Sequence, residues 1–203
     1  MKYISDIIKI GSLLAASAVL LLACNKEPEQ FTETFPVPTG STLEETLLAN
    51  ANDSLYNRMV IKGGMAATLN DSSRVHTLFV PDNNAVIASF GGSLASANAT
   101  IDAMPAATCA AIVKYSMLPQ LVNSDHIIHD FPNLQAPTDI ILDPTNPLVR
   151  MTAFPSKNDA TGLFYYNNVP LTATDALAAN GVIHHIAFVA APPTAVLKTC
   201  QRW

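Results

Sequence analysis

The densest group of potential metal ligands in the sequence lies in one short segment. Four carboxylate or imidazole side chains occur within six residues: Asp125, His126, His129 and Asp130. His184 or His185 could add a further ligand. Histidines three positions apart share one face of a helix but diverge on a strand, and this segment carries β-branched residues between its histidines. We therefore expect an exposed turn or strand edge here, with neither a metal ion nor a cofactor.

The sequence lacks the short motifs that carry common catalytic chemistry. It has no Gly-x-Ser-x-Gly nucleophile turn, no glycine-rich phosphate loop, no His-Glu-x-x-His pair and no paired-cysteine zinc pattern. The sequence therefore predicts a protein that is not an enzyme.

Aromatic and amide side chains form a candidate sugar-binding group near the C-terminal end. In an extended Phe164-Tyr165-Tyr166 segment, Phe164 and Tyr166 point to one side and Tyr165 to the other. Packing in a core explains the first side. Tyr165 with Asn167 and Asn168 could stack on and hydrogen-bond a carbohydrate ring, so these three residues are the candidate ligand-binding residues.

Composition excludes several classes of protein. Of the 203 residues, 49% are hydrophobic and 13% are charged, and the net charge is −5. These values fit a globular domain and do not fit a disordered polyelectrolyte. An acidic chain also has no electrostatic reason to bind nucleic acid or anionic lipid headgroups.

The N-terminus resembles an export signal. Lys2 and Lys9 precede an apolar run from Ile10 to Leu22, which is too short to cross a bilayer core of about 30 Å. The run ends in Leu-Leu-Ala before Cys24, which resembles the bacterial lipobox. We therefore interpret residues 1–23 as a lipoprotein signal peptide. The alternatives are a plain signal peptide with a coincidental cysteine, or an uncleaved anchor.

In a lipoprotein of this kind, Cys24 carries diacylglycerol and a further acyl chain such as palmitate, which is more than the two signals that stable membrane anchoring requires. Residues 24–42 then form a lipidated N-terminus and a linker rich in proline and glutamate. A linker of this length extends to roughly 60 Å. Residues 43–193 form the domain, and residues 194–203 a C-terminal tail.

Two further cysteines remain, Cys109 and Cys200. In an exported protein they could form a disulfide. The alternative is two unpaired thiols, with Cys109 as a small core residue on a helix and Cys200 on a loose tail.

Helix signals occur early in the domain. Thr42 and Glu45 have the spacing of a capping box, and Asp82 is placed to cap a helix. Apolar spacing predicts further helices. The predicted helices are a short one after Thr42, 54–61, 83–90 and 106–117.

Strand signals come mainly later. The predicted strands are 76–80, 148–154, 162–167 and 182–189. Because most helices precede most strands, the order favours an α+β domain over a repeated parallel βαβ unit.

Three segments resemble motifs of the fasciclin domain family. They are Thr77–Val86, Ile112–Pro119 and Asn180–Ile186, the last followed by Pro192-Pro193. The residues that match the family's motifs are Pro81, Asp82, Asn84, Tyr115, Asn180, Gly181 and His184. The resemblance spans Thr77 to Pro193, and the preceding helices extend it toward Ser41.

The resemblance implies an α+β fold, a fasciclin-like β-sandwich or wedge with several helices packed around it. We expect mostly structural roles for the motif residues. Asn180 and Gly181 would supply positive φ angles for a tight turn into a strand. His184 would be a hydrogen-bonded structural group, while His185, on the opposite face of that strand, would be exposed or at the sheet edge.

The resemblance also implies a role in adhesion or extracellular binding. Animal members have a Tyr-His pair linked to integrin-dependent adhesion, but here Ser116 follows Tyr115, which weakens an integrin role and favours packing for Tyr115. We expect a non-enzymatic lipoprotein anchored in the outer membrane through Cys24, at the cell surface or on the periplasmic face. Its domain would bind a glycan or an extracellular protein. The alternative is a periplasm-facing accessory lipoprotein that binds a partner protein in an envelope complex.

Overall fold

Helices dominate the first half of the domain. The computed structural model describes residues 40–128 and 134–193. Its α-helices are α2 (Leu43–Ala49), α3 (Ser54–Lys62), α4 (Ala66–Asn70), α5 (Asn83–Ser89), α6 (Leu94–Ala103) and α7 (Ala106–Tyr115), and its 3₁₀ helices are η1 (Ala51–Asp53) and η2 (Ser124–His126). No helix in these two ranges is long and apolar enough to cross a membrane.

The predicted helix starts are confirmed at two caps. Thr42 accepts a hydrogen bond from the amide of Glu45, whose side chain accepts one from the amide of Thr42, so the capping box is complete. The Asp82 side chain accepts a hydrogen bond from Ala85 N at 2.8 Å and starts α5. These contacts satisfy amides that would otherwise lack partners at the first helical turn.

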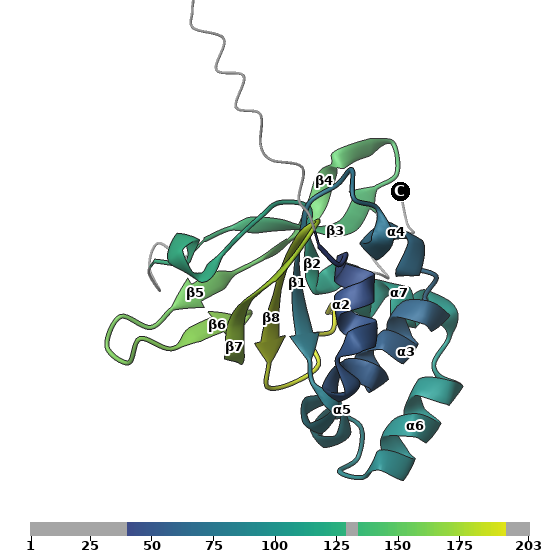
Figure 1. Cartoon of the computed structure of the whole chain (residues 1–203). Coiled ribbons are helices and arrows are strands. Elements are labelled where there is room, and N and C mark those ends of the chain that lie inside the picture. The colour runs from purple at the N-terminus through teal and green to yellow at the C-terminus, as the bar shows by residue number, and fades with distance from the viewer. Residues whose placement is uncertain (1–39, 129–133, 194–203) are drawn as a thin grey trace, which may run out of the picture. The chain divides into compact units, whose positions relative to one another are not determined.

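The strands, labelled in Figure 1, form two sheets. The larger has the order β2-β1-β8-β7-β6-β5, and the smaller is a β3–β4 pair. The strands are β1 (His76–Pro81), β2 (Met117–Leu118), β3 (Ala136–Asp143), β4 (Asn146–Ala153), β5 (Pro155–Lys157), β6 (Phe164–Tyr166), β7 (Val169–Ala178) and β8 (Gly181–Ile186). The α+β class is therefore confirmed.

The central pair β1 and β8 is parallel, although the other pairs are antiparallel. Phe79 lies beside His184 and Val80 beside His185 in this pair. The N-terminal helices lie against one side of β1 and β8, and β5 and β6 form the far end of the sheet (Figure 1).

Two apolar cores lie on opposite faces of β1 and β8. The first joins the helices to Leu78, Val80 and Ile183. The second is built on Phe79 and Ile186, together with residues from the later strands. Alternate residues along each strand supply the two cores, as the twofold periodicity of a strand requires.

The prediction of positive φ at Asn180 and Gly181 is wrong. Among the described residues, positive φ angles of non-glycine residues occur at Asn167, Asn168 and Asp175. Gly181 is required for a different reason, because a Cβ at this position would lie 2.0 Å from the carbonyl oxygen of His76 on the neighbouring strand. Asn180 instead acts through the hydrogen bonds of its side chain to backbone groups of the N-terminal helices.

The tight turn with two positive φ angles lies between β6 and β7. Asn167 has φ 49° and Asn168 has φ 67°, and positive φ at both central residues is the requirement of a type I′ hairpin turn. Asparagine tolerates this conformation better than other residues with a Cβ. The two asparagines predicted to bind a ligand therefore also form the turn of a hairpin.

Candidate ligand-binding site

Three of the residues singled out in the sequence line one surface pocket. The pocket has a volume of about 370 Å³ and is lined by Tyr115, Phe154, Asn167 and Asn168. Tyr115 is the last residue of α7, Phe154 follows β4, and the two asparagines form the β6–β7 turn. The fold thus brings together side chains from three separate parts of the chain.

Buried aromatic rings support the pocket from behind. The Tyr115 ring meets Tyr166 edge-on, with centroids 6.4 Å apart, and the Tyr166 hydroxyl donates to the backbone oxygen of Tyr115. Tyr166 in turn stacks on Phe79 at 4.0 Å, and Phe79 stacks on His184 at 5.2 Å. The position of Tyr115 is therefore fixed by the second core.

Asn167 joins the turn to Phe154. Its Oδ1 accepts a hydrogen bond from Phe154 N at 2.8 Å, and its own amide donates to Phe154 O at 3.2 Å. These two contacts hold the Phe154 backbone against the hairpin. The Phe154 side chain is 40% exposed, so its ring is accessible at the pocket.

The Nδ2 atom of Asn167 is buried and has no hydrogen-bond partner among the described residues. The assignment of the amide is settled by chemistry, because the atom facing Phe154 N must be an acceptor and is therefore the oxygen. A buried donor left without a partner costs about 1–3 kcal/mol. This unsatisfied donor belongs to a residue that lines the pocket.

Tyr115 contributes a second polar group. Burial raises the pKa of its phenol, so the hydroxyl stays protonated at neutral pH and can both donate and accept. Within residues 40–128 and 134–193, no side chain or backbone group hydrogen-bonds this hydroxyl or the side-chain amide of the exposed Asn168. The pocket therefore offers free hydrogen-bonding groups beside an exposed ring.

Tyr165 does not line this pocket. It is half-buried on the side of β6 opposite Tyr166, and its neighbours across the sheet are Ser156 and Pro170. The predicted group of Tyr165, Asn167 and Asn168 is therefore wrong in Tyr165. The aromatic residues that line the pocket with the two asparagines are Tyr115 and Phe154. No sequence signal indicates that Phe154 lies beside the asparagines, because this proximity depends on tertiary packing.

The first family segment lies at the junction of β1 and α5. Pro81 ends β1 opposite Ile186, and Asp82 caps α5. Asn84 is exposed, whereas its neighbour Asn83 connects α5 to the N-terminal helices. Asn83 Oδ1 accepts from Leu55 N at 2.9 Å and its Nδ2 donates to Ala51 O at 2.9 Å.

Asn180 links three elements through its buried side chain. Its Oδ1 accepts from Leu43 N at 2.8 Å, and its Nδ2 donates to Leu69 O at 2.9 Å and to Asp71 O at 3.1 Å. The side chain thereby satisfies backbone groups at the start of α2 and at the end of α4. This accounts for an asparagine at the entrance to β8.

The two histidines of β8 lie on opposite faces of the sheet. His184 is fully buried, and its Nδ1 accepts from Asp175 N at 3.2 Å while its Nε2 donates to Val122 O at 2.8 Å. The expectation that His185 is exposed or at an edge is wrong. Its strand lies between β1 and β7, and its Nε2 is 3.0 Å from Oδ1 of the buried Asp53.

The predicted exposed turn near the metal-ligand candidates corresponds to η2, where Asp125 and His126 are exposed. His129 and Asp130 lie outside the described residues. Within the ranges described, no cluster of three or more histidine, cysteine, aspartate or glutamate side chains could hold a metal ion.

Cys109 is fully buried on α7 and belongs to the first core. Burial raises the pKa of its thiol. Cys200, like Cys24, lies outside the described residues, so pairing of Cys109 with Cys200 stays a prediction, as do the signal peptide, the linker and the tail.

Comparison with known proteins agrees with this architecture. The model of the fasciclin domain family matches residues 53–192. Among solved structures, a pair of fasciclin domains from the insect cell adhesion molecule Fasciclin I is similar, with a TM-score of 0.60 and 15% sequence identity over 77% of this chain. The chain spans about half of that structure, 52% of its length. The comparison with curated proteins gives no match.

Proposed function

Because the chain belongs to the fasciclin domain family, we propose that it is a non-enzymatic lipoprotein of the cell envelope whose domain acts as an adhesion module that binds polysaccharide. The family relationship supports an adhesion-like role, since the similar solved protein is a cell adhesion molecule. The polysaccharide ligand and the location in the cell envelope are proposals that go beyond this relationship.

The observation that carries the proposal is the pocket of Tyr115, Phe154, Asn167 and Asn168. It combines an exposed aromatic ring with hydrogen-bonding groups that no described residue satisfies. Binding sites of this kind use apolar surface for affinity and a few polar groups for orientation. A sugar ring meets both requirements, because it has an apolar face and a rim of hydroxyl groups.

The proposed anchor is the lipid on Cys24. The supporting feature is the basic and apolar leader that ends in Leu-Leu-Ala before this cysteine. In this arrangement the domain is tethered by its N-terminal end, and the proline-rich linker lets it stand away from the membrane.

The location is tested by protease accessibility on intact cells of the native host. The account predicts that the domain is digested on intact cells, and that a Cys24→Ala variant no longer sediments with membranes. Lysed cells serve as the control for cleavage. Protection until lysis would contradict surface display and would favour an accessory lipoprotein that binds a partner inside the envelope.

A further inference from the structure

The hydrogen-bonding pattern at the pocket defines what the missing partner must supply. Asn167 Oδ1 is already occupied by Phe154 N, so its unsatisfied Nδ2 can only donate. The complementary ligand atom is therefore an acceptor oxygen. An apolar ligand group placed here would leave the donor unsatisfied, as it is in the free protein, and would gain nothing from it.

The remaining groups favour a ligand with several hydroxyl groups. The Tyr115 hydroxyl and the Asn168 amide each can donate and accept, and neither has a partner among the described residues. Phe154 adds an exposed ring beside them. A ligand that uses all three must present polar groups beside an apolar face, and hydroxyl groups suit both polar residues because they donate and accept as well.

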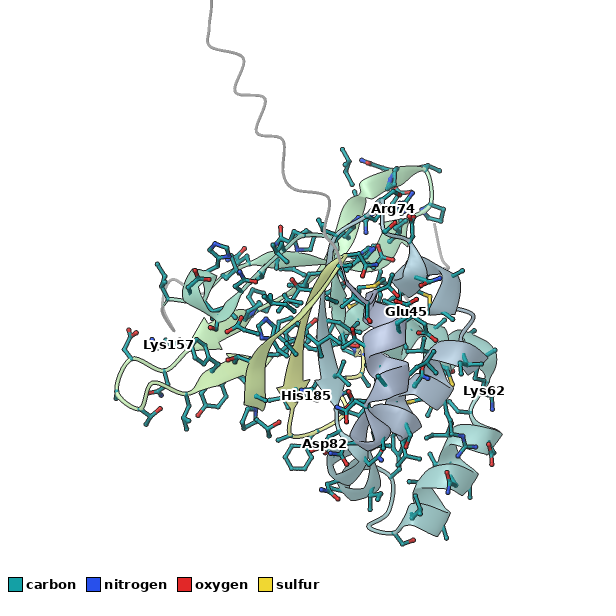
Figure 2. The ribbon with its side chains drawn as sticks, in the orientation of Figure 1. Glu45, Lys62, Arg74, Asp82, Lys157 and His185 are labelled. Atoms are coloured by element: carbon teal, nitrogen blue, oxygen red, sulfur yellow. The ribbon has the colours of Figure 1, made fainter. Side chains whose placement is uncertain are left out.

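Charge sets the class of sugar. Every residue that lines the pocket is uncharged. Lys114, next to Tyr115 in α7, lines a different pocket with Asp139 and Ile140, and Lys157, on β5 (Figure 2), has its Nζ 5.3 Å from the centre of the Phe164 ring. A carboxylate or sulfate in the pocket would thus find no lining cation to pair with, so the pocket has no charge that favours an acidic sugar.

Size limits how much of a glycan the pocket holds. Its volume of about 370 Å³ lies near the lower end of the roughly 300–1,000 Å³ that is usual for small-ligand sites. This is room for a short unit and not for a long segment of a chain. The exposure of Phe154 and Asn168 leaves the pocket open to solvent, so the rest of a polymer can extend outside it.

From these observations we infer that the pocket binds an uncharged sugar unit of a polysaccharide. Asn167 Nδ2 donates to a ring or hydroxyl oxygen, the Tyr115 hydroxyl and the Asn168 amide bond neighbouring hydroxyls, and Phe154 contacts the apolar face of the ring. The inference rests on the proposed function and names its ligand class and its binding residues.

The test measures binding of the purified full-length protein, kept in detergent, to two sets of oligosaccharides. One set is neutral and contains glucose, mannose, galactose and N-acetylglucosamine oligomers. The other contains glucuronate and galacturonate oligomers of matched length. The inference predicts binding within the neutral set and weaker or no binding to the acidic set. Binding confined to the acidic set would overturn the assignment of ligand class.

Two variants locate the site. Asn167→Asp keeps the acceptor for Phe154 N and tolerates positive φ, but it removes the donor, so the affinity should fall by about tenfold or more. Phe154→Ala removes the exposed ring and should weaken binding by a similar factor. Retained circular dichroism and thermal unfolding temperature would show that both variants still fold.

The matched controls are Phe188→Ala and Tyr165→Phe. Phe188 is 51% exposed and does not line the pocket, and Tyr165 lies on the other face of β6 from Tyr166. Both variants should bind as the wild type does. If sugar binding persists in Asn167→Asp and Phe154→Ala, the site assignment fails while polysaccharide binding stands. If neither oligosaccharide set binds, the sugar ligand itself is wrong, whatever the location of the protein.

Discussion

His185 Nε2 lies 3.0 Å from Asp53 Oδ1 and 3.2 Å from its Oδ2, which connects the central strand β8 to the N-terminal helical segment. The Asp53 side chain is only 2% exposed and also accepts a hydrogen bond from Asn50 Nδ2 at 2.9 Å. Asp82, at the end of β1, adds a second negative group near His185 (Figure 2). The hydrogen bond that His185 donates to the Asp53 carboxylate raises the pKa of His185 above its usual value of 6.5, against the effect of burial.

This pair should stabilise the fold most under mildly acidic conditions. A raised histidine pKa contributes stability that is fully present below pH 6.5 and is lost as the pH rises through the folded-state value. We expect Asp53→Asn to lower the free energy of unfolding by about 1–3 kcal/mol at pH 6 and by less at pH 8.5. Urea unfolding at both values measures this, and an equal loss at both would contradict it.

The two neighbouring histidines of β8 should titrate in opposite directions. Burial lowers the pKa of His184, and its Nδ1 must be unprotonated to accept from Asp175 N. A lowered pKa means that the contribution to stability is present above pH 6.5 and is lost as the pH falls through the folded-state value. Ring-proton NMR should find His184 titrating below pH 6.5 and His185 above it. Equal pKa values for the two histidines, or a higher pKa for His184 than for His185, would contradict this prediction.

Asn180→Ala should be strongly destabilising. The change removes the partners of Leu43 N and Leu69 O, both of which are buried contacts, and leaves a small cavity. We expect a loss of about 2–4 kcal/mol in the free energy of unfolding. Asn84→Ala is the control, because Asn84 is exposed and should change stability by less than about 0.5 kcal/mol.

Tyr115→Phe should separate binding from stability. The Tyr115 hydroxyl has no hydrogen-bond partner in the part of the chain that is described, so its removal should leave the unfolding free energy within about 0.5 kcal/mol of wild type. Binding of a neutral oligosaccharide should weaken by up to about tenfold. Tyr166→Phe provides the comparison, since its hydroxyl donates to Tyr115 O and its loss should cost about 1 kcal/mol of stability. Equal stability losses in both variants would contradict the assignment.

The sequence predicts best those features that depend on neighbouring residues. The caps at Thr42 and Asp82 each involve residues three positions apart, and the buried face of α3 follows from apolar spacing. Helix α6 escaped prediction because its capping box uses Ser93 and Ser96 instead of an acidic partner. The sequence does not predict strand β7, because Pro170 and Asp175 are residue types that are rare inside strands.

Features that depend on tertiary contacts could not be predicted in the same way. An Asn-Gly pair is compatible with a positive-φ turn or with a side-chain anchor, and only the packing of Leu43 and Asp71 around Asn180 selects the anchor. The pocket is a similar case. Its asparagines were identified from the sequence, but Tyr115 and Phe154 reach them through the packing of Tyr166 and the hydrogen bonds of Asn167.

The most direct measurement of the central claim is the adherence of intact native-host cells to surfaces coated with a neutral polysaccharide, either a glucan or a mannan. Cells that carry the wild-type protein or Phe188→Ala should adhere alike, whereas cells that lack the protein or carry Phe154→Ala at the same surface level should be washed away. Equal adherence of cells with and without the protein would contradict the account of a polysaccharide-binding adhesion module.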